Sequence, residues 1–158
     1  DIGGVISVAG NDGRDGDAFL KTPPVTDALQ VIAELVEHRF GSQVYLVSKC
    51  GFKMQHRTKL WLRAQNFYAN TGVSPDHAWY CIERKEKAII ASILGLTHFI
   101  DDRLEILSYL TMMPEKILFR PKPREVEMYK SELPYVARVE SWNEVRKLWL
   151  REPCGHHE

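Results

Sequence analysis

The sequence has no excess of charge, few cysteines and no long apolar run, and each of these absences argues against a class of protein. Lys+Arg and Asp+Glu both number 21, so nothing indicates a nucleic-acid-binding or membrane-surface protein. The three cysteines lie at unrelated spacings and match no zinc site, which favours a reducing, cytoplasmic setting. No apolar run reaches about 18 residues, so we expect no membrane span and no membrane partner.

The length and composition indicate one domain. With 158 residues and 44% hydrophobic content, the chain can bury about 70% of the surface that its unfolded form would expose. A separate substrate-binding domain would not fit comfortably. We therefore expect residues 1–158 to form a single domain without a large cap, carrying a Gly- and Asp-rich flap at residues 8–22.

Short apolar runs alternate with amphipathic stretches, a pattern typical of βαβ units and a parallel sheet. The predicted fold is therefore α/β, a three-layer α/β/α sandwich with a mainly parallel, Rossmann-like sheet. We expect strands at residues 1–7, 43–48, 78–83, 97–100, 116–119 and 136–139. We expect helices at residues 25–41, 53–70, 86–94, from 102 onward and at 142–150.

Polar side chains stand where several of these elements begin or end. Asp1 opens the first apolar run, Ser48 ends the second, and Asp101 and Asp102 follow the fourth. Lys87 begins the helix that leads to the fourth strand. Ligands of such sheets bind outside the carboxyl ends of the strands, so we expect these side chains to meet there. Because a catalytic aspartate normally follows a buried strand, we also expect the first strand to be truncated at Asp1.

In this order the residues resemble the four motifs of the haloacid-dehalogenase-like (HAD) hydrolase superfamily, most of whose members are phosphatases. The resemblance spans roughly residues 1 to 110, and its most specific part is the segment Leu96 to Arg103. It implies Asp1 as nucleophile, Ser48 as phosphate-binding hydroxyl and Lys87 as neutralising cation. It also implies a Mg²⁺ site made of Asp1, the backbone carbonyl of Gly3, Asp101 and Asp102.

One position departs from the pattern of the family. Phosphatases of this kind usually carry a second aspartate two positions after the nucleophile, and here that position is Gly3. Gly3 still offers a backbone carbonyl to a metal, but it offers no general acid to protonate the leaving group. A general acid typically contributes 10²–10⁴-fold to the rate, so the departure bears directly on turnover.

Two assignments stay open at the level of sequence. Lys85 lies two residues before Lys87 and could take the role of the motif lysine. Asp102 could be a metal ligand or an outer partner of the metal, or it could cap the next helix, because Glu105 follows three residues later as in a capping box.

Two other phosphate chemistries fit the sequence poorly. A cysteine phosphatase needs five residues between its Cys and its Arg, whereas six residues separate Cys50 from Arg57. A response-receiver domain has its paired acids after the first strand, whereas here Asp101 and Asp102 come late. The order of the residues therefore favours the hydrolase family.

The sequence thus predicts a Mg²⁺-dependent phosphohydrolase that acts on a small phosphomonoester through an aspartyl-phosphate intermediate. The alternative is a catalytically weak or inactive HAD-like protein that binds Mg²⁺ and a phosphate ligand or a protein partner, because Gly3 replaces the usual acid. Neither hypothesis predicts the oligomeric state.

Overall fold

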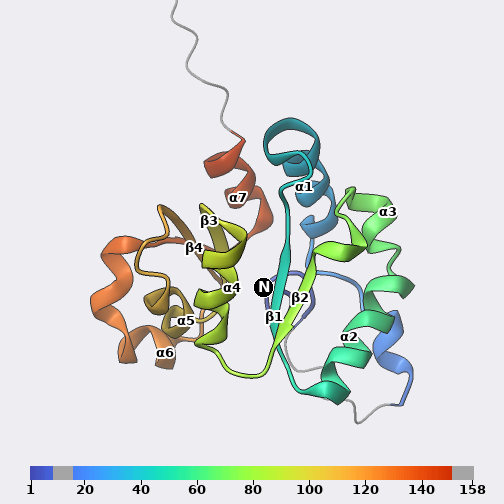
Figure 1. Ribbon diagram of the computed structural model, residues 1–158, viewed down its shortest axis with the longest axis horizontal. Helices are drawn as coiled ribbons and strands as arrows, with labels where there is room; N and C mark the ends of the chain where they lie inside the picture. Colours follow the sequence, from blue (N-terminus) through green and yellow to red (C-terminus); the bar gives the residue numbers. More distant parts are fainter. Residues whose placement is uncertain (9–15, 151–158) are drawn as a thin grey trace, which may run out of the picture.

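The protein is an α/β structure in which every strand pair is parallel (Figure 1), as the alternation predicts. The computed structural model describes residues 1–8 and 16–150. Its strands form two sheets, one in the order β1-β2 and the other in the order β3-β4-β5. The strands are β1 (Leu46–Lys49), β2 (Ala78–Cys81), β3 (His98–Asp101), β4 (Glu115–Phe119) and β5 (Ala137–Val139).

Helices connect the strands and cover both faces of the sheets. The α-helices are α1 (Ala28–Leu35), α2 (Phe52–Ala64), α3 (Phe67–Thr71), α4 (Glu86–Leu94), α5 (Leu104–Tyr109), α6 (Pro123–Met128) and α7 (Trp142–Trp149). Four shorter helical segments are η1 (Ala18–Lys21), η2 (Val36–Phe40), η3 (Pro75–His77) and η4 (Lys130–Tyr135). None of the helices described is long and apolar enough to cross a membrane.

Alternating side chains of the strands divide the core into two clusters. Leu46 of β1 and Ile117 of β4 pack in a cluster that contains residues of α1, α2, α3 and α7. Their neighbours Val47 and Leu118 pack in a second cluster, with residues of α4 and α5. Since successive side chains of a strand point to opposite faces, the helices form two layers with the strands between them.

Most predicted elements form near their expected positions, and the largest differences lie at helix boundaries. The helix expected at 53–70 is interrupted at Asn66, whose φ of 51° is left-handed. The helix expected from residue 25 starts later, after Asp27, which has a φ of 66°. The polar, Pro-containing stretch before β5 forms α6 and η4, although the sequence predicted no helix there.

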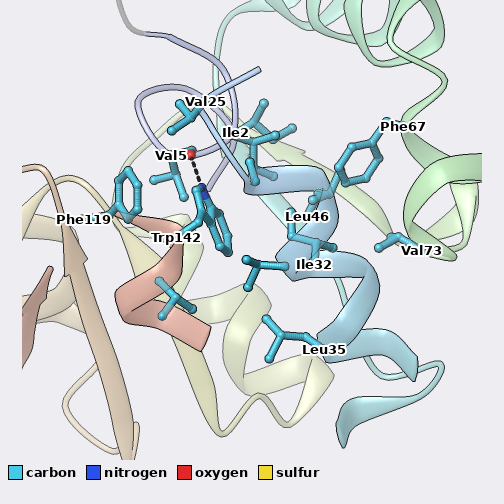
Figure 2. Close-up of a cluster of buried hydrophobic side chains, with 14 of the residues drawn as sticks. Ile2, Val5, Val25, Ile32, Leu35, Leu46, Phe67, Val73, Phe119 and Trp142 are labelled. Atoms are coloured by element: carbon cyan, nitrogen blue, oxygen red, sulfur yellow. Dashed lines mark hydrogen bonds between the residues drawn. The ribbon is translucent and has the colours of Figure 1, made fainter. Parts of the chain in front are cut away.

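The prediction of a strand at residues 1–7 is wrong. The carbonyl of Ile2 accepts hydrogen bonds from the N–H groups of Val5, Ile6 and Ser7, and Gly4 N–H donates to Ser7, so the chain folds into a tight turn. Gly4 has a φ of 78°, a backbone conformation that favours glycine. The turn is fastened by Trp142 of α7, whose Nε1 donates to the Val5 carbonyl at 2.9 Å (Figure 2).

The flap predicted at residues 8–22 is described only in part, because residues 9–15 lie outside the described ranges. Its last part is ordered by η1, where Phe19 is buried. The aromatic ring of Phe19 also lies under the Arg57 guanidinium of α2, 3.9 Å from its central carbon. This end of the flap is therefore packed against the body of the protein.

Candidate functional site

Three carboxylates from two distant parts of the chain meet at the carboxyl end of β3. Asp101 is the last residue of β3, Asp102 follows it, and the backbone nitrogen of Asp1 donates to the Ile100 carbonyl at 3.0 Å. One carboxylate oxygen from each of Asp1, Asp101 and Asp102 lies within 4.8 Å of the others. Such a set of oxygen donors suits a hard divalent cation such as Mg²⁺.

Lys87 joins two of these carboxylates. Its Nζ lies 3.1 Å from Asp1 Oδ1 and 2.8 Å from Asp101 Oδ2. The side chains of Lys87 and Asp101 are 1% and 0% exposed, so these contacts lie where water does not weaken them. A buried ammonium that bridges two carboxylates offsets part of their mutual repulsion.

The structure distinguishes the two candidate lysines. Lys85 is exposed, and its Nζ lies 5.8 Å from the centre of the Tyr109 ring. Lys87 is buried in the first turn of α4, where it points at the acidic cluster. Of the two, Lys87 therefore has the contacts that the motif lysine would need.

Asp102 does not cap the following helix. The N-cap residue of α5 is Arg103, which makes no side-chain cap bond, and the Arg103 N–H donates instead to Asp101 Oδ1 at 3.0 Å. Glu105, expected to complete a capping box, accepts from Arg84 at 2.8 Å and Tyr129 at 3.0 Å. The capping-box interpretation is therefore wrong, and the Asp102 carboxylate is left to the acidic cluster.

Burial, together with the charge of Asp101, raises the pKa of Asp102 to about 6 from its ordinary value of 3.8. The folded protein therefore holds this proton more tightly than the unfolded chain does. The stabilisation from this proton is complete below about pH 4 and is lost as the pH rises through about 6.

We expect the metal-free protein to lose thermal stability between about pH 4 and pH 7, relative to an Asp102→Asn variant that cannot titrate there. The measurement is the melting temperature of both proteins in a chelator, followed across this range. If the melting temperatures of the two proteins differ by the same amount at every pH, the raised pKa of Asp102 is contradicted.

A pocket of about 420 Å³ opens over the cluster. Asp1, Lys87 and Asp102 line it, and so does Ser48, whose side chain is buried at the end of β1. The pocket is also lined by four cationic side chains from four segments: Lys49, Arg84, Arg103 and Lys122. The structure thus gathers Asp1, Ser48, Lys87 and Asp102 around one cavity, with Asp101 buried behind Lys87.

Sequence reasoning missed Arg84 and Lys122 as pocket residues. Arg84 lies in the loop after β2, and Lys122 lies in the loop after β4. The rule that ligands bind beyond the carboxyl ends of parallel strands could have identified both. Arg84 is held by Glu105, and Arg103 by Glu125 at 3.1 Å, so acidic residues of α5 and α6 orient this part of the rim.

The two glycines after Asp1 have different surroundings. A Cβ at Gly3 would meet no atom within 4 Å, whereas a Cβ at Gly4 would lie 2.9 Å from Cγ of Asp102. The turn therefore presses the backbone of residue 4 against the acidic cluster and leaves room for a side chain at residue 3.

Gly4→Ala should lower the free energy of unfolding by about 1–2 kcal/mol, because a left-handed backbone is strained for any residue with a Cβ, and should also displace Asp102. Gly3→Ala is the matched control and should be nearly neutral. Urea unfolding of both variants measures the difference. Equal losses of unfolding free energy in the two variants would show that the close approach of Gly4 to Asp102 does not affect stability.

Other candidate chemistries find little support. Cys50 is buried and its pKa is raised by that burial, which disfavours the thiolate that a cysteine nucleophile needs. Both Cys50 and Cys81 are free thiols. Within residues 1–8 and 16–150, Asp1, Asp101 and Asp102 form the only group of three or more potential metal ligands.

Comparison with known proteins gives one informative relative. The chain is 26% identical over 126 residues to a protein of Oceanobacillus iheyensis named "Putative nucleotidase OB0422". The match covers 80% of this chain and 61% of the relative, so the chain spans about three fifths of that protein's length. No family model and no solved structure matches the chain significantly.

Proposed function

We propose that this protein is a Mg²⁺-dependent phosphohydrolase of the HAD type, with Asp1 as its nucleophile. The observation that carries the proposal is the Lys87 ammonium held between Asp1 and Asp101, with Asp102 beside them. The name of the bacterial relative, a nucleotidase, supports hydrolysis of a phosphate ester. The motif resemblance supports the same reaction independently.

The acidic cluster fits Mg²⁺ by its donor set. Asp1, Asp101 and Asp102 together with the Gly3 carbonyl would hold the ion, which would neutralise phosphate charge and orient the phosphoryl group. Lys87 occupies one oxygen of Asp1 and one of Asp101. The second oxygen of Asp1 is then the one available for attack.

In the first step an Asp1 oxygen attacks phosphorus, the P–O bond to the leaving group breaks, and an aspartyl-phosphate forms. The departing oxygen takes a proton from water, because Gly3 supplies no acid. In the second step water attacks the phosphorus, which releases inorganic phosphate and regenerates the Asp1 carboxylate. Lys87 and the Ser48 hydroxyl hold the phosphate oxygens through both steps.

The pocket favours a small, anionic substrate. Its volume of about 420 Å³ lies within the range of about 300–1,000 Å³ that small-molecule sites occupy. Lys49 and Lys122 lie on its rim, where they would attract a phosphate. A phosphomonoester of the size of a nucleotide suits both the volume and the charge.

The test is an assay of phosphate release from a panel of nucleoside monophosphates and sugar phosphates, with Mg²⁺ and with a chelator. We expect release that depends on Mg²⁺. The second candidate function, a weak or inactive Mg²⁺- and phosphate-binding protein, is favoured by Gly3. Mg²⁺ binding without turnover on any substrate would decide for that function.

Gly3→Asp tests whether the missing acid limits the rate. Residue 3 is exposed and a side chain there has room, so the substitution should restore proton donation and raise kcat by about 10²–10⁴-fold on alkyl phosphates. Turnover of p-nitrophenyl phosphate should change little, because its leaving group needs no proton. Gly3→Asn is the matched control, and an equal gain in that variant would contradict the acid role.

A further inference from the structure

The cationic side chains of the pocket over the acidic cluster lie at two separate places along the rim of the sheets. Lys49 ends β1 next to Ser48, on the side where the hydroxyl would hold the transferred phosphate. Arg103 and Lys122 follow β3 and β4 instead. Because β4 pairs with β3 and neighbouring strands lie about 4.8 Å apart, the pocket extends past the acidic cluster by one strand.

Arg84 belongs to the same side of the pocket as Arg103. Its Nη1 lies 2.8 Å from Oε2 of Glu105 in α5, and the Nη1 of Arg103 lies 3.1 Å from Oε2 of Glu125 in α6. The two acidic residues are themselves joined, because the Glu105 N–H donates to Glu125 Oε1 at 3.3 Å. Figure 1 shows α5 and α6 beside each other on the β3-β4 side of the molecule. One network of carboxylates therefore fixes both guanidinium groups.

These ion pairs leave hydrogen-bond donors for a ligand. Each guanidinium uses Nη1 for its carboxylate, and within the described ranges nothing accepts from the Nε or Nη2 of Arg84 or Arg103. The carboxylates of Glu105 and Glu125 are 16% and 13% exposed, whereas both arginine side chains are 38% exposed and line the pocket. Lys122 is exposed and has no ion pair with a described residue. The free donors therefore lie on the pocket side of the network.

The transferred phosphate accounts for only part of the positive charge in the pocket. Lys87 is shared between Asp1 and Asp101, and in the proposed function Mg²⁺ at the acidic cluster would offset the charge of the phosphoryl group. The cations beyond the cluster face the same cavity. Planar guanidinium groups with free N–H donors are suited to bind the oxygens of a phosphate or a carboxylate.

We propose that the pocket takes a phosphomonoester that carries a second anionic group, a phosphate or a carboxylate, bound by Arg84, Arg103 and Lys122. The inference rests on the proposed function for the place of the transferred phosphate. The arginines would donate N–H bonds to the second group, and the lysine would add a point charge. A volume of about 420 Å³ admits two such groups on a short carbon skeleton. The second anion, and not the transferred phosphate, would then determine which substrate is chosen.

The test measures binding, so that it does not depend on turnover. Bisphosphonates with linkers of roughly two to five carbons, a size that suits the pocket, are compared with alkylphosphonates of the same length. The comparison uses titration calorimetry with Mg²⁺ in excess. Their P–C bonds are not phosphate esters, so hydrolysis does not interfere. We expect the Kd of the best bisphosphonate to be about tenfold or more below that of its partner. Phosphonates that end in a carboxylate distinguish the two kinds of second anion.

Variants on the two sides of the pocket locate the second anion. Arg103→Gln and Lys122→Gln should each reduce the preference for the bisphosphonate by about threefold or more. Lys49→Gln changes a cation on the other side and should leave the ratio of the two Kd values as it is. Arg124→Gln is the matched control, because Arg124 is an exposed cation of α6 that does not line the pocket, and it should change neither Kd.

Two results would overturn the inference. One is equal affinity for phosphonate and bisphosphonate at every linker length. The other is an equal fall of the preference in Lys49→Gln and Lys122→Gln, which would show a general attraction of anions to the pocket. Absence of phosphate release from every substrate of the panel, with the binding preference intact, would contradict the proposed function but not the second anion site.

Discussion

Turnover should fall by about 10³-fold or more when Asp1 is replaced by asparagine, because the amide is a poor nucleophile and no aspartyl-phosphate can form. The amide side chain would keep an oxygen within reach of Lys87, which now contacts Asp1 Oδ1 at 3.1 Å. We therefore expect the Asp1→Asn variant to fold normally but to lose hydrolytic activity. The measurement is kcat on the best substrate of the phosphomonoester panel, with circular dichroism to confirm folding.

Asp76→Asn provides the matched control for this loss. Asp76 is an exposed acid in η3 and does not line the pocket, so its replacement should leave kcat unchanged. If Asp1→Asn retains most of the wild-type activity, another group must be the nucleophile and the HAD mechanism fails for this protein. A large loss in both variants would instead indicate a general effect of charge.

Lys87→Met should destabilise the protein by about 3–5 kcal/mol, the range for removing one partner of a buried ion pair. Without the ammonium, the fully buried Asp101 carboxylate faces Asp1 and Asp102 with no cation among them. Melting temperature in a chelator measures the loss, which we expect to be about 10 °C. Mg²⁺ should restore part of it, because the ion would take over the neutralising role.

Lys85→Met is the control for this prediction. Lys85 precedes the same helix and carries the same charge, but it is exposed, so its replacement should change the melting temperature by less than about 2 °C. Equal destabilisation in the two variants would show that the buried ion pairs of Lys87 contribute no more to stability than the exposed charge of Lys85. Destabilisation of Lys87→Met without any rescue by Mg²⁺ would argue against a cation site at the acidic cluster.

The sequence predicted best those elements whose signals are local. Helix α4 has the predicted bounds, 86–94, and ends at Gly95 in the left-handed conformation that a helix stop favours. Strands β2, β3 and β4 lie within one or two residues of their predicted positions, because each is a short apolar run between turn residues. Periodicity and turn chemistry suffice to find such elements.

The start of the chain could not be predicted in this way. Residues 1–7 have the apolar letters of a strand, but a strand needs a partner, and pairing depends on segments far along the chain. The conformational freedom of Gly3 and Gly4 allows the turn that forms instead. The hydrophobic pattern alone could not decide whether residues 1–7 form a strand or a turn.

The candidate site shows the same limit at the level of single side chains. Spacing could not separate Lys85 from Lys87, because both lie at the entry to one helix. Only the packing of α4, which buries one lysine and exposes the other, distinguishes them. Similarly, the spacing of Asp102 and Glu105 fits a cap, but the Glu105 carboxylate instead accepts hydrogen bonds from Arg84 and Tyr129, which lie outside α5, and from Tyr109 of the same helix.

The hydrogen bond from Trp142 to Val5 spans 137 positions of the chain, which has a consequence for the order of assembly. During synthesis the turn at residues 1–7 emerges long before the Trp142 indole that fastens it. Contacts of such long sequence separation form late. The turn that carries Asp1 would therefore take its final shape only after α7 has left the ribosome, and a chain that ends before Trp142 should lack a well-formed acidic cluster.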